Sequence, residues 1–211
     1  MAKRVKPRDI NSFIVFVDIC DATNLSNSLS TTDYGNFILQ FNQSAQAAFK
    51  AVIEPSFPGR LLNDSVEFTV RGDEVCLLIH GKHTPRLDDS EYDESRDFEL
   101  AIRFVLLLYT NWILQPINIE RIRREQLPLL LSVGVHYGPV YYSQFTKKKW
   151  SSEGYSINTA KRIESSSKVS NRLALCGVTD SDRVNTKVIS IEPTHKLNLK
   201  SRLLRTNRRF S

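Results

Sequence analysis

The fold can be read outward from one segment, Val66-Glu67-Phe68-Thr69-Val70-Arg71-Gly72-Asp73-Glu74-Val75-Cys76-Leu77-Leu78-Ile79. In its first half, apolar and polar residues alternate, which is typical of a strand with one buried face. Its second half is a nearly continuous apolar run. Gly72-Asp73 stands between them, and glycine-aspartate pairs are common in tight turns. The segment therefore predicts a β-hairpin whose turn carries a carboxylate.

Two further elements are expected before this hairpin. Residues 12–18, Ser-Phe-Ile-Val-Phe-Val-Asp, form a short apolar run that predicts a buried strand with Asp18 at its carboxyl end. The chain that follows predicts a helix from Asp33, as its N-cap, to about Ile53. Its apolar face would carry Phe37, Phe41, Ala45, Ala48 and Val52.

Beyond the hairpin, apolar residues at helical spacing predict a long helix from Phe98 to Trp112 that stops near Pro116. We then expect a second strand pair, residues 129–137 and 140–145, around a turn at Gly138-Pro139.

A last helix is expected from Ile157 to about Lys168, with Thr159, Ala160 and Ile163 on its inner face. Residues 173–176 and 188–191 predict late strands. The order β-α-β-β-α-β-β-α-β indicates an α+β fold derived from the ferredoxin-like βαββαβ unit. In such a fold, helices cover one face of a mostly antiparallel sheet.

Length and composition exclude several classes of protein. The chain has 211 residues, 41% of them hydrophobic and 25% charged, which suits one globular domain. Apolar runs are far shorter than the ~20 residues of a membrane span, and no signal stretch follows the basic start. Three cysteines without a C-x-x-C pair argue against a disulfide framework and a zinc site. We expect a cytoplasmic protein without a membrane partner.

The positive charge is concentrated at the carboxyl end. The net charge is +6, and the six lysines and arginines between Lys196 and Ser211 account for all of it. We divide the chain into a basic extension at 1–11, a main domain at 12–200 and a basic tail at 201–211. The tail is either a solvated end or a contact to polyphosphate or nucleic acid. No nucleic-acid-binding signature is present, so we expect no nucleic acid partner.

The expected strands bring two carboxylates close together. Asp18 ends one strand and Asp73 lies in a turn, so the two could be neighbours. Carboxylate pairs hold Mg²⁺ or Mn²⁺, and two such ions ~3.5–4 Å apart promote phosphoryl transfer. The turn at Cys20, Asp21, Ala22 and Thr23 precedes a helix, so its N–H groups could bind phosphates.

A second set of candidates lies on the last helix. Asn158 and Arg162 are four residues apart and share one face. An amide and a fixed cation suit a sugar oxygen and a charged phosphoryl transition state. Each feature alone also has a purely structural explanation, and His136 within an apolar strand is more often a core histidine than a base. Their joint occurrence in this order favours a functional site.

Four motifs together resemble the catalytic domain of class III nucleotide cyclases, the adenylate and guanylate cyclase family. They are Phe16-Val17-Asp18-Ile19, Gly72-Asp73, Gly134-Val135-His136-Tyr137-Gly138-Pro139-Val140, and the segment 154–164 with Gly154, Asn158 and Arg162. Leu197-Asn198-Leu199-Lys200 is similar to the family's late strand with a phosphate-binding lysine. The likeness runs from Phe13 to about Lys200.

The resemblance implies a role for each matching residue. Asp18, Asp73 and the Ile19 carbonyl would hold two metal ions, Asn158 would orient the ribose, and Arg162 would stabilise the pentavalent phosphorus. In this family the last two come from the partner subunit. Because one chain carries every role, the resemblance implies a homodimer with two shared active sites and a nucleoside triphosphate substrate.

Two positions depart from the family's purine codes. Thr69 stands where adenylate cyclases have lysine and guanylate cyclases commonly have glutamate. Ser151 stands where adenylate cyclases have aspartate and guanylate cyclases commonly have cysteine. A domain lacking both codes resembles the pyrimidine cyclases of bacterial antiphage Pycsar systems. The resemblance implies cyclic UMP or cyclic CMP, with UTP slightly favoured over CTP, as a messenger that activates an effector.

Two other readings stay open: a purine cyclase with an atypical base pocket, and a catalytically silent domain that binds nucleotide as a sensor. The silent domain would be expected to have lost a motif residue, and none is lost. A diguanylate cyclase would require Gly-Gly-Asp-Glu-Phe, and the chain has only Arg71-Gly72-Asp73-Glu74-Val75.

Overall fold

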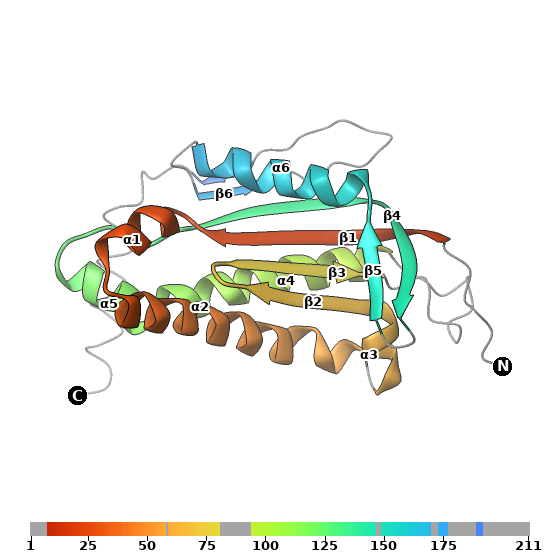
Figure 1. Ribbon diagram of the computed structural model, residues 1–211, viewed down its shortest axis with the longest axis horizontal. Coiled ribbons are helices and arrows are strands. Elements are labelled where there is room, and N and C mark those ends of the chain that lie inside the picture. Colours follow the sequence, from red (N-terminus) through yellow and green to blue (C-terminus); the bar gives the residue numbers. More distant parts are fainter. Residues whose placement is uncertain are drawn as a thin grey trace.

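A computed structural model describes residues 8–57, 59–80, 94–146, 149–169, 173–176 and 189–191. Its elements alternate between strands and helices in the expected manner (Figure 1). In chain order they are β1 (Arg8–Ile19), α1 (Ala22–Ser28), α2 (Thr31–Val52), η1 (Glu54–Ser56), α3 (Arg60–Ser65), β2 (Val66–Arg71), β3 (Glu74–Ile79), α4 (Glu94–Ile113), α5 (Pro116–Arg123), β4 (Leu131–Thr146), β5 (Lys149–Glu153), α6 (Tyr155–Val169), β6 (Leu173–Cys176) and β7 (Ile189–Ile191).

The strands form one mostly antiparallel sheet in the order β2-β3-β1-β4-β6-β7, with β5 paired to β4. Only the β4–β6 pairing is parallel among the described strands. The order β2-β3-β1-β4, with α2 and α4 as its connecting helices, is the ferredoxin-like arrangement. The predicted α+β class is confirmed.

Strand β1 separates two apolar layers. Its residues Phe13, Val15 and Val17 belong to the main core with α2 and α4, where Trp112 is fully buried. The intervening Ile14 and Phe16 pack in a second cluster with Ala160 and Ile157 of α6. Helices were expected on one face only. This holds for α2 and α4, whereas α6 lies on the opposite face along β4 and β1 (Figure 1).

One predicted turn is wrong. Gly138-Pro139 does not join two strands, because β4 continues through it to Thr146. Gly138 and Pro139 lie opposite Ser12 and Asn11 of β1, a strand of 12 residues that pairs with β4 along its whole length. Gly138 is not among the glycines with positive φ. The long partner strand therefore keeps this segment extended, and the chain turns back only at β5.

Helix boundaries differ from the expectation in small ways. The N-cap of α2 is Ser30, whose hydroxyl accepts a 3.1 Å hydrogen bond from the N–H of Asp33. Asp33 therefore lies in the first turn and is not the cap. Helix α4 ends at Ile113, and Pro116 begins α5, where proline needs no hydrogen-bonded N–H.

At the amino-terminal end the structure differs from the predicted division. Strand β1 begins at Arg8, so the sheet includes residues that were assigned to the extension 1–11. Strands β6 and β7 match the two predicted late strands. The tail 201–211 lies outside the described residues.

No single described helix is long and apolar enough to cross a membrane. The pair Ser95–Ile113 and Pro116–Arg123, bent by 57°, meets the length and composition requirement together. Its longer member packs in the main core through Phe104, Leu108 and Trp112.

Candidate active site

The two predicted metal ligands lie side by side at one end of the central strands. Asp18 is opposite Glu74 in the β1–β3 ladder, and the backbone N–H of Ile19 donates a 3.2 Å hydrogen bond to the carbonyl of Asp73. Gly72 has φ +63°, a conformation that favours glycine, and so allows the tight turn that places Asp73 there. Asp18 is 7% exposed and Asp73 is half-buried.

The turn after Asp18 is ordered by backbone contacts. The N–H of Cys20 donates a 2.9 Å hydrogen bond to the carbonyl of Leu130, just before β4, so this N–H is not free to bind a phosphate. Asp21 has φ 64° and precedes α1 without a side-chain cap. Ala22 and Thr23 form the first turn of α1. Only part of the predicted phosphate loop therefore keeps the geometry expected for it.

Tyr34 of α2 belongs to the same end of the molecule. Partial burial raises the pKa of its hydroxyl, and the negative charges of Asp73 and Asp18 raise it further. Both carboxylates therefore act electrostatically on Tyr34, and its hydroxyl stays protonated at neutral pH. Nothing in the local sequence of α2 could have indicated this electrostatic interaction.

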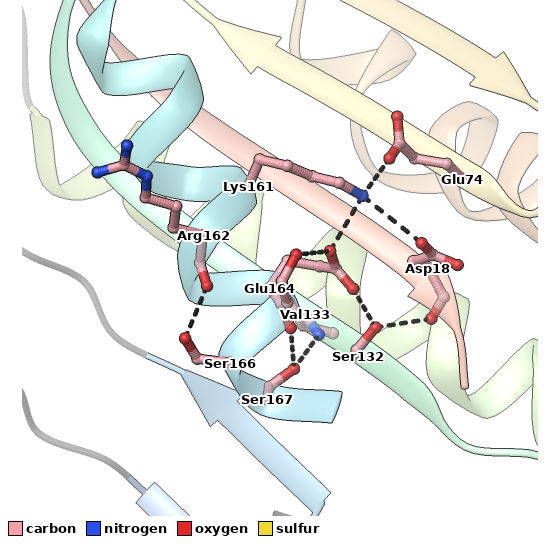
Figure 2. Close-up of polar contacts among 10 residues, drawn as sticks. Asp18, Glu74, Ser132, Val133, Lys161, Arg162, Glu164, Ser166 and Ser167 are labelled. Atoms are coloured by element: carbon pink, nitrogen blue, oxygen red, sulfur yellow. Dashed lines mark hydrogen bonds and ion pairs between the residues drawn. The ribbon is translucent and has the colours of Figure 1, made fainter. Parts of the chain in front are cut away.

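Lys161 of α6 reaches the carboxylates from the opposite face of the sheet. Its Nζ lies 3.5 Å from Oδ2 of Asp18 and 3.0 Å from Oε2 of Glu164, and it forms an ion pair with Glu74 (Figure 2). Burial alone would lower the pKa of Lys161, but hydrogen bonds to Glu74 and Glu164 and their charges raise it above the usual range. Sequence reasoning missed this lysine.

Glu164 anchors the cluster inside the protein. Its side chain is fully buried, and its carboxylate accepts a hydrogen bond from the Ser132 hydroxyl, which also lies 3.2 Å from the Asp18 carbonyl. A buried carboxylate is tolerated only when it is paired and hydrogen-bonded. Lys161 and Ser132 supply those contacts, so the acidic site and α6 are held together by one network.

The buried face of α6 is more polar than predicted. Thr159 and Ile163 are only partly buried, while the buried positions are Ser156, Ala160, Glu164 and Ser167. The inner face was predicted from apolar residues at helical spacing. Serine and glutamate do not fit that pattern, so the sequence did not indicate that they would be buried.

Glycines in β4 set how close α6 comes to the sheet. A Cβ atom at Gly134 would overlap the carbonyl of Ala160 and lie 2.5 Å from the backbone N of Glu164. One at Gly138 would lie 2.5 Å from the Ser156 hydroxyl. These two glycines of the motif 134–140 therefore allow the close packing through which Lys161 reaches Asp18.

The two predicted transition-state residues lie on the outer face of α6. Asn158 and Arg162 are both exposed. In Figure 2 the guanidinium of Arg162 points away from Asp18, while Lys161 points toward it. The structure thus brings Asn158 and Arg162 to one helix face, as predicted, but within a single chain it does not bring them to the aspartates.

The predicted base-recognition residues are described in part. Thr69 is half-buried on β2, opposite Cys76 of β3. Burial of the Cys76 thiol, together with the charges of Glu74 and Glu67, raises its pKa to about 12. Ser151 lies in β5, where only its backbone is described, and Lys200 lies outside the described residues. Glu67 accepts a 2.7 Å hydrogen bond from Ser152, which ties β2 to β5.

His136 lies inside the protein, a position that suits a core histidine. It is buried in β4, and burial lowers its pKa, which favours the neutral imidazole. The histidine lies on the α6 side of the sheet, where its Nε2 is close to the position of a Cβ at Gly138.

The donor atoms at Asp18 and Asp73 fit a hard divalent ion. Two carboxylates and the backbone carbonyl of Ile19 are oxygen ligands, the type that Mg²⁺ and Mn²⁺ prefer. One cation, the ammonium of Lys161, already lies 3.5 Å from Asp18. Within the described ranges no three His, Cys, Asp or Glu side chains are grouped to hold a metal. Any ion here would need further oxygens from water or substrate phosphate.

Neither protein-family models nor curated proteins match this sequence. Solved structures, in contrast, are similar to this protein in fold. The adenylyl cyclase CyaB from P. aeruginosa superposes with a TM-score of 0.56 at 14% identity, over 87% of this chain and 93% of that one. The catalytic core of a rhodopsin-guanylyl cyclase with converted specificity, in complex with ATPαS, superposes with a TM-score of 0.54 at 14% sequence identity. The match covers 86% of this chain and 94% of that one.

The protein has the fold of class III nucleotide cyclase catalytic domains. A bacterial light-regulated adenylyl cyclase is also similar, with a TM-score of 0.53 at 17% identity over 80% of this chain. The protein spans only 43% of that cyclase's length. The resemblance inferred from the motifs is thus confirmed for the fold.

Proposed function

We propose that the protein is a nucleotide cyclase, which converts a nucleoside triphosphate into its 3′,5′-cyclic monophosphate and pyrophosphate. The observation that carries the proposal is the adjacency of Asp18 and Asp73 in a class III cyclase fold. In the reaction, the ribose 3′ oxygen would attack the α-phosphorus while the bond to the bridging oxygen breaks, and pyrophosphate would leave. The side chains and carbonyl at this end of β1 suit the triphosphate's counter-ions.

Asp18, Asp73 and the Ile19 carbonyl would hold two Mg²⁺ or Mn²⁺ ions together with the triphosphate oxygens. Such ions neutralise phosphate charge and activate the attacking oxygen. The protein itself would contribute the position and charge of these groups. Asp18 lies at the end of β1, Asp73 lies in the adjoining turn, and the charges of both raise the pKa of Tyr34.

A homodimer with two shared sites is proposed because the side chains assigned to ribose and phosphorus face outward from α6. Asn158 and Arg162 are exposed on the side of α6 that points away from Asp18 (Figure 2). In a second subunit the same surface could meet the first subunit's carboxylates, where the amide would orient the ribose and the guanidinium would stabilise the developing charge.

The proposed substrate is a pyrimidine nucleotide, UTP slightly before CTP. Support comes from Thr69 and Ser151, two small hydroxyl residues that match neither purine code. A site formed by hydrogen bonds discriminates strongly, because a mismatched base leaves polar groups unpaired. With this substrate class we also propose, from the resemblance alone, a cytoplasmic role in bacterial antiviral defence with a cyclic-nucleotide-activated effector.

The test is to incubate the purified protein with each of the four nucleoside triphosphates and Mn²⁺, and to identify the product by mass spectrometry. Cyclic UMP or cyclic CMP is expected. Asp73→Asn should abolish its formation, whereas Asp9→Asn, at an exposed position of the same strand β1, should not. Cyclic AMP or cyclic GMP alone would refute the pyrimidine assignment. No product from folded protein would favour a silent nucleotide-binding domain.

A further inference from the structure

One cation is already present among the carboxylates of the proposed site. Lys161 contacts acidic side chains from three elements: Asp18 of β1, Glu74 of β3 and Glu164 of α6 (Figure 2). Its own side chain is 37% exposed and that of Asp18 is 10% exposed, so these contacts are only partly screened by water. A divalent ion that binds Asp18 must therefore approach a nearby ammonium.

The three contacts are unequal in length. Oδ2 of Asp18 lies 3.5 Å from Nζ, beyond hydrogen-bond distance, whereas Oε2 of Glu164 lies at 3.0 Å and Glu74 is in direct contact. If Asp18 turned to another cation, Lys161 would keep its two closer partners. Asp18 is thus the carboxylate that Lys161 can release without leaving its place.

Lys161 is also unable to withdraw freely. Glu164 is fully buried and is paired with this ammonium, and a buried carboxylate without its counter-ion is strongly destabilising. The positive charge is held within reach of Asp18 whether or not another cation is bound.

We propose that Lys161 is a built-in counter-ion of the metal site that competes with divalent cations for Asp18. This inference rests on the proposed metal-binding role of Asp18 and Asp73. It makes the free protein a weak binder of Mn²⁺, with its carboxylates already neutralised in part. Tight metal binding then requires the additional negative charge of a triphosphate, so the ion and the nucleotide bind together. Lys161 acts through Asp18 and is a positioning residue.

The inference is tested by titrating the nucleotide-free protein with Mn²⁺ and measuring free Mn²⁺ by electron paramagnetic resonance. The main variant is the double substitution Lys161→Met with Glu164→Gln, which removes the buried pair together and leaves the net charge unchanged. We expect it to bind Mn²⁺ about threefold more tightly, because the gain from losing the ammonium near Asp18 is partly offset by the loss of the Glu164 carboxylate. Lys161→Arg, which keeps the charge, should stay within about threefold of wild type.

A second neutral variant guards against misfolding. Lys161→Gln has an amide that can still donate to Glu164, and circular dichroism shows which of the two variants is folded. Because Lys161→Gln removes the ammonium and keeps the Glu164 carboxylate, we expect it to bind Mn²⁺ about tenfold more tightly than wild type. Unchanged Mn²⁺ affinity in folded Lys161→Gln protein, or in the double variant where only that one folds, would overturn the inference.

Asp73→Asn separates this failure from failure of the proposed function. Asp73→Asn is made both in the wild-type protein and in the Lys161→Gln protein. If it weakens Mn²⁺ binding in both, while the lysine substitutions change nothing, the metal site is supported and only the proposed role of Lys161 is wrong. If Asp73→Asn has no effect in either background, the metal assignment itself is wrong, and the inference falls with it.

Discussion

The two faces of α6 differ in what determines their residues. The inner face carries Ser156, Ala160 and Glu164, which pack on β4, and Lys161 at its border reaches Asp18. The outer face carries Asn158 and Arg162, which are exposed. Contacts among the described residues account for the buried side chains of the inner face, whereas the side chains of Asn158 and Arg162 are exposed. Substitutions on the inner face should therefore change stability and metal binding, and those on the outer face should change catalysis alone.

For the two faces of α6, the largest effect is expected for Arg162→Ala on the outer face. Loss of a cation aimed at transition-state charge costs about 10²–10³-fold in kcat. Because the side chain is exposed, the free energy of unfolding should change by less than about 0.5 kcal/mol. Steady-state turnover and urea denaturation measure the two quantities. Arg103→Ala, at an exposed position of α4, is the matched control and should change neither. Turnover within threefold of wild type would remove Arg162 from the mechanism.

Mixing two inactive proteins tests whether the outer face serves a second subunit. Asp73→Ala and Arg162→Ala each lack one half of every shared site, but a mixed dimer contains one intact site of two. Random exchange of equal amounts should restore about a quarter of wild-type turnover. The measurement is product formation before and after exchange, with exchange followed by fluorescence transfer between labelled subunits. No recovery despite complete exchange would contradict the shared site.

Gly134→Ala tests the inner face. The added methyl group would overlap backbone atoms of Ala160 and Glu164, so α6 must shift away from β4. Overpacking of this kind costs about 2–3 kcal/mol of unfolding free energy, measured by denaturation. The same shift moves Lys161 relative to Asp18. A change below about 0.5 kcal/mol would show that α6 is not held where we describe it.

The smallest effect, of opposite sign, is expected for Gly35→Ala in α2. No atom lies within 4 Å of the Cβ position, and its φ is not in the left-handed region. Alanine is favoured over glycine inside helices, so the substitution should stabilise the protein by about 0.5–1 kcal/mol. The same denaturation experiment measures it. Destabilisation here would mean that the cost at Gly134 cannot be assigned to the contact with α6.

Short-range patterns predicted the parts of the molecule that depend on neighbouring residues. The alternation at 66–71 and the turn at Gly72-Asp73 gave the β2–β3 hairpin correctly, because side-chain period and turn conformation are local properties. The turn expected at Gly138-Pro139 was wrong for the complementary reason. Glycine and proline permit a turn, but pairing with all of β1 keeps β4 extended.

By itself, the sequence determined the α+β order of elements, the strand-terminal Asp18, the turn with Asp73, and the common face of Asn158 and Arg162, because each follows from spacing along one element. Only the tertiary structure decided that α6 crosses to the second face of the sheet and that Lys161 meets Asp18, Glu74 and Glu164 there. Those residues are far apart in the chain, and no local period records which charges the packing of a helix on a sheet will bring together.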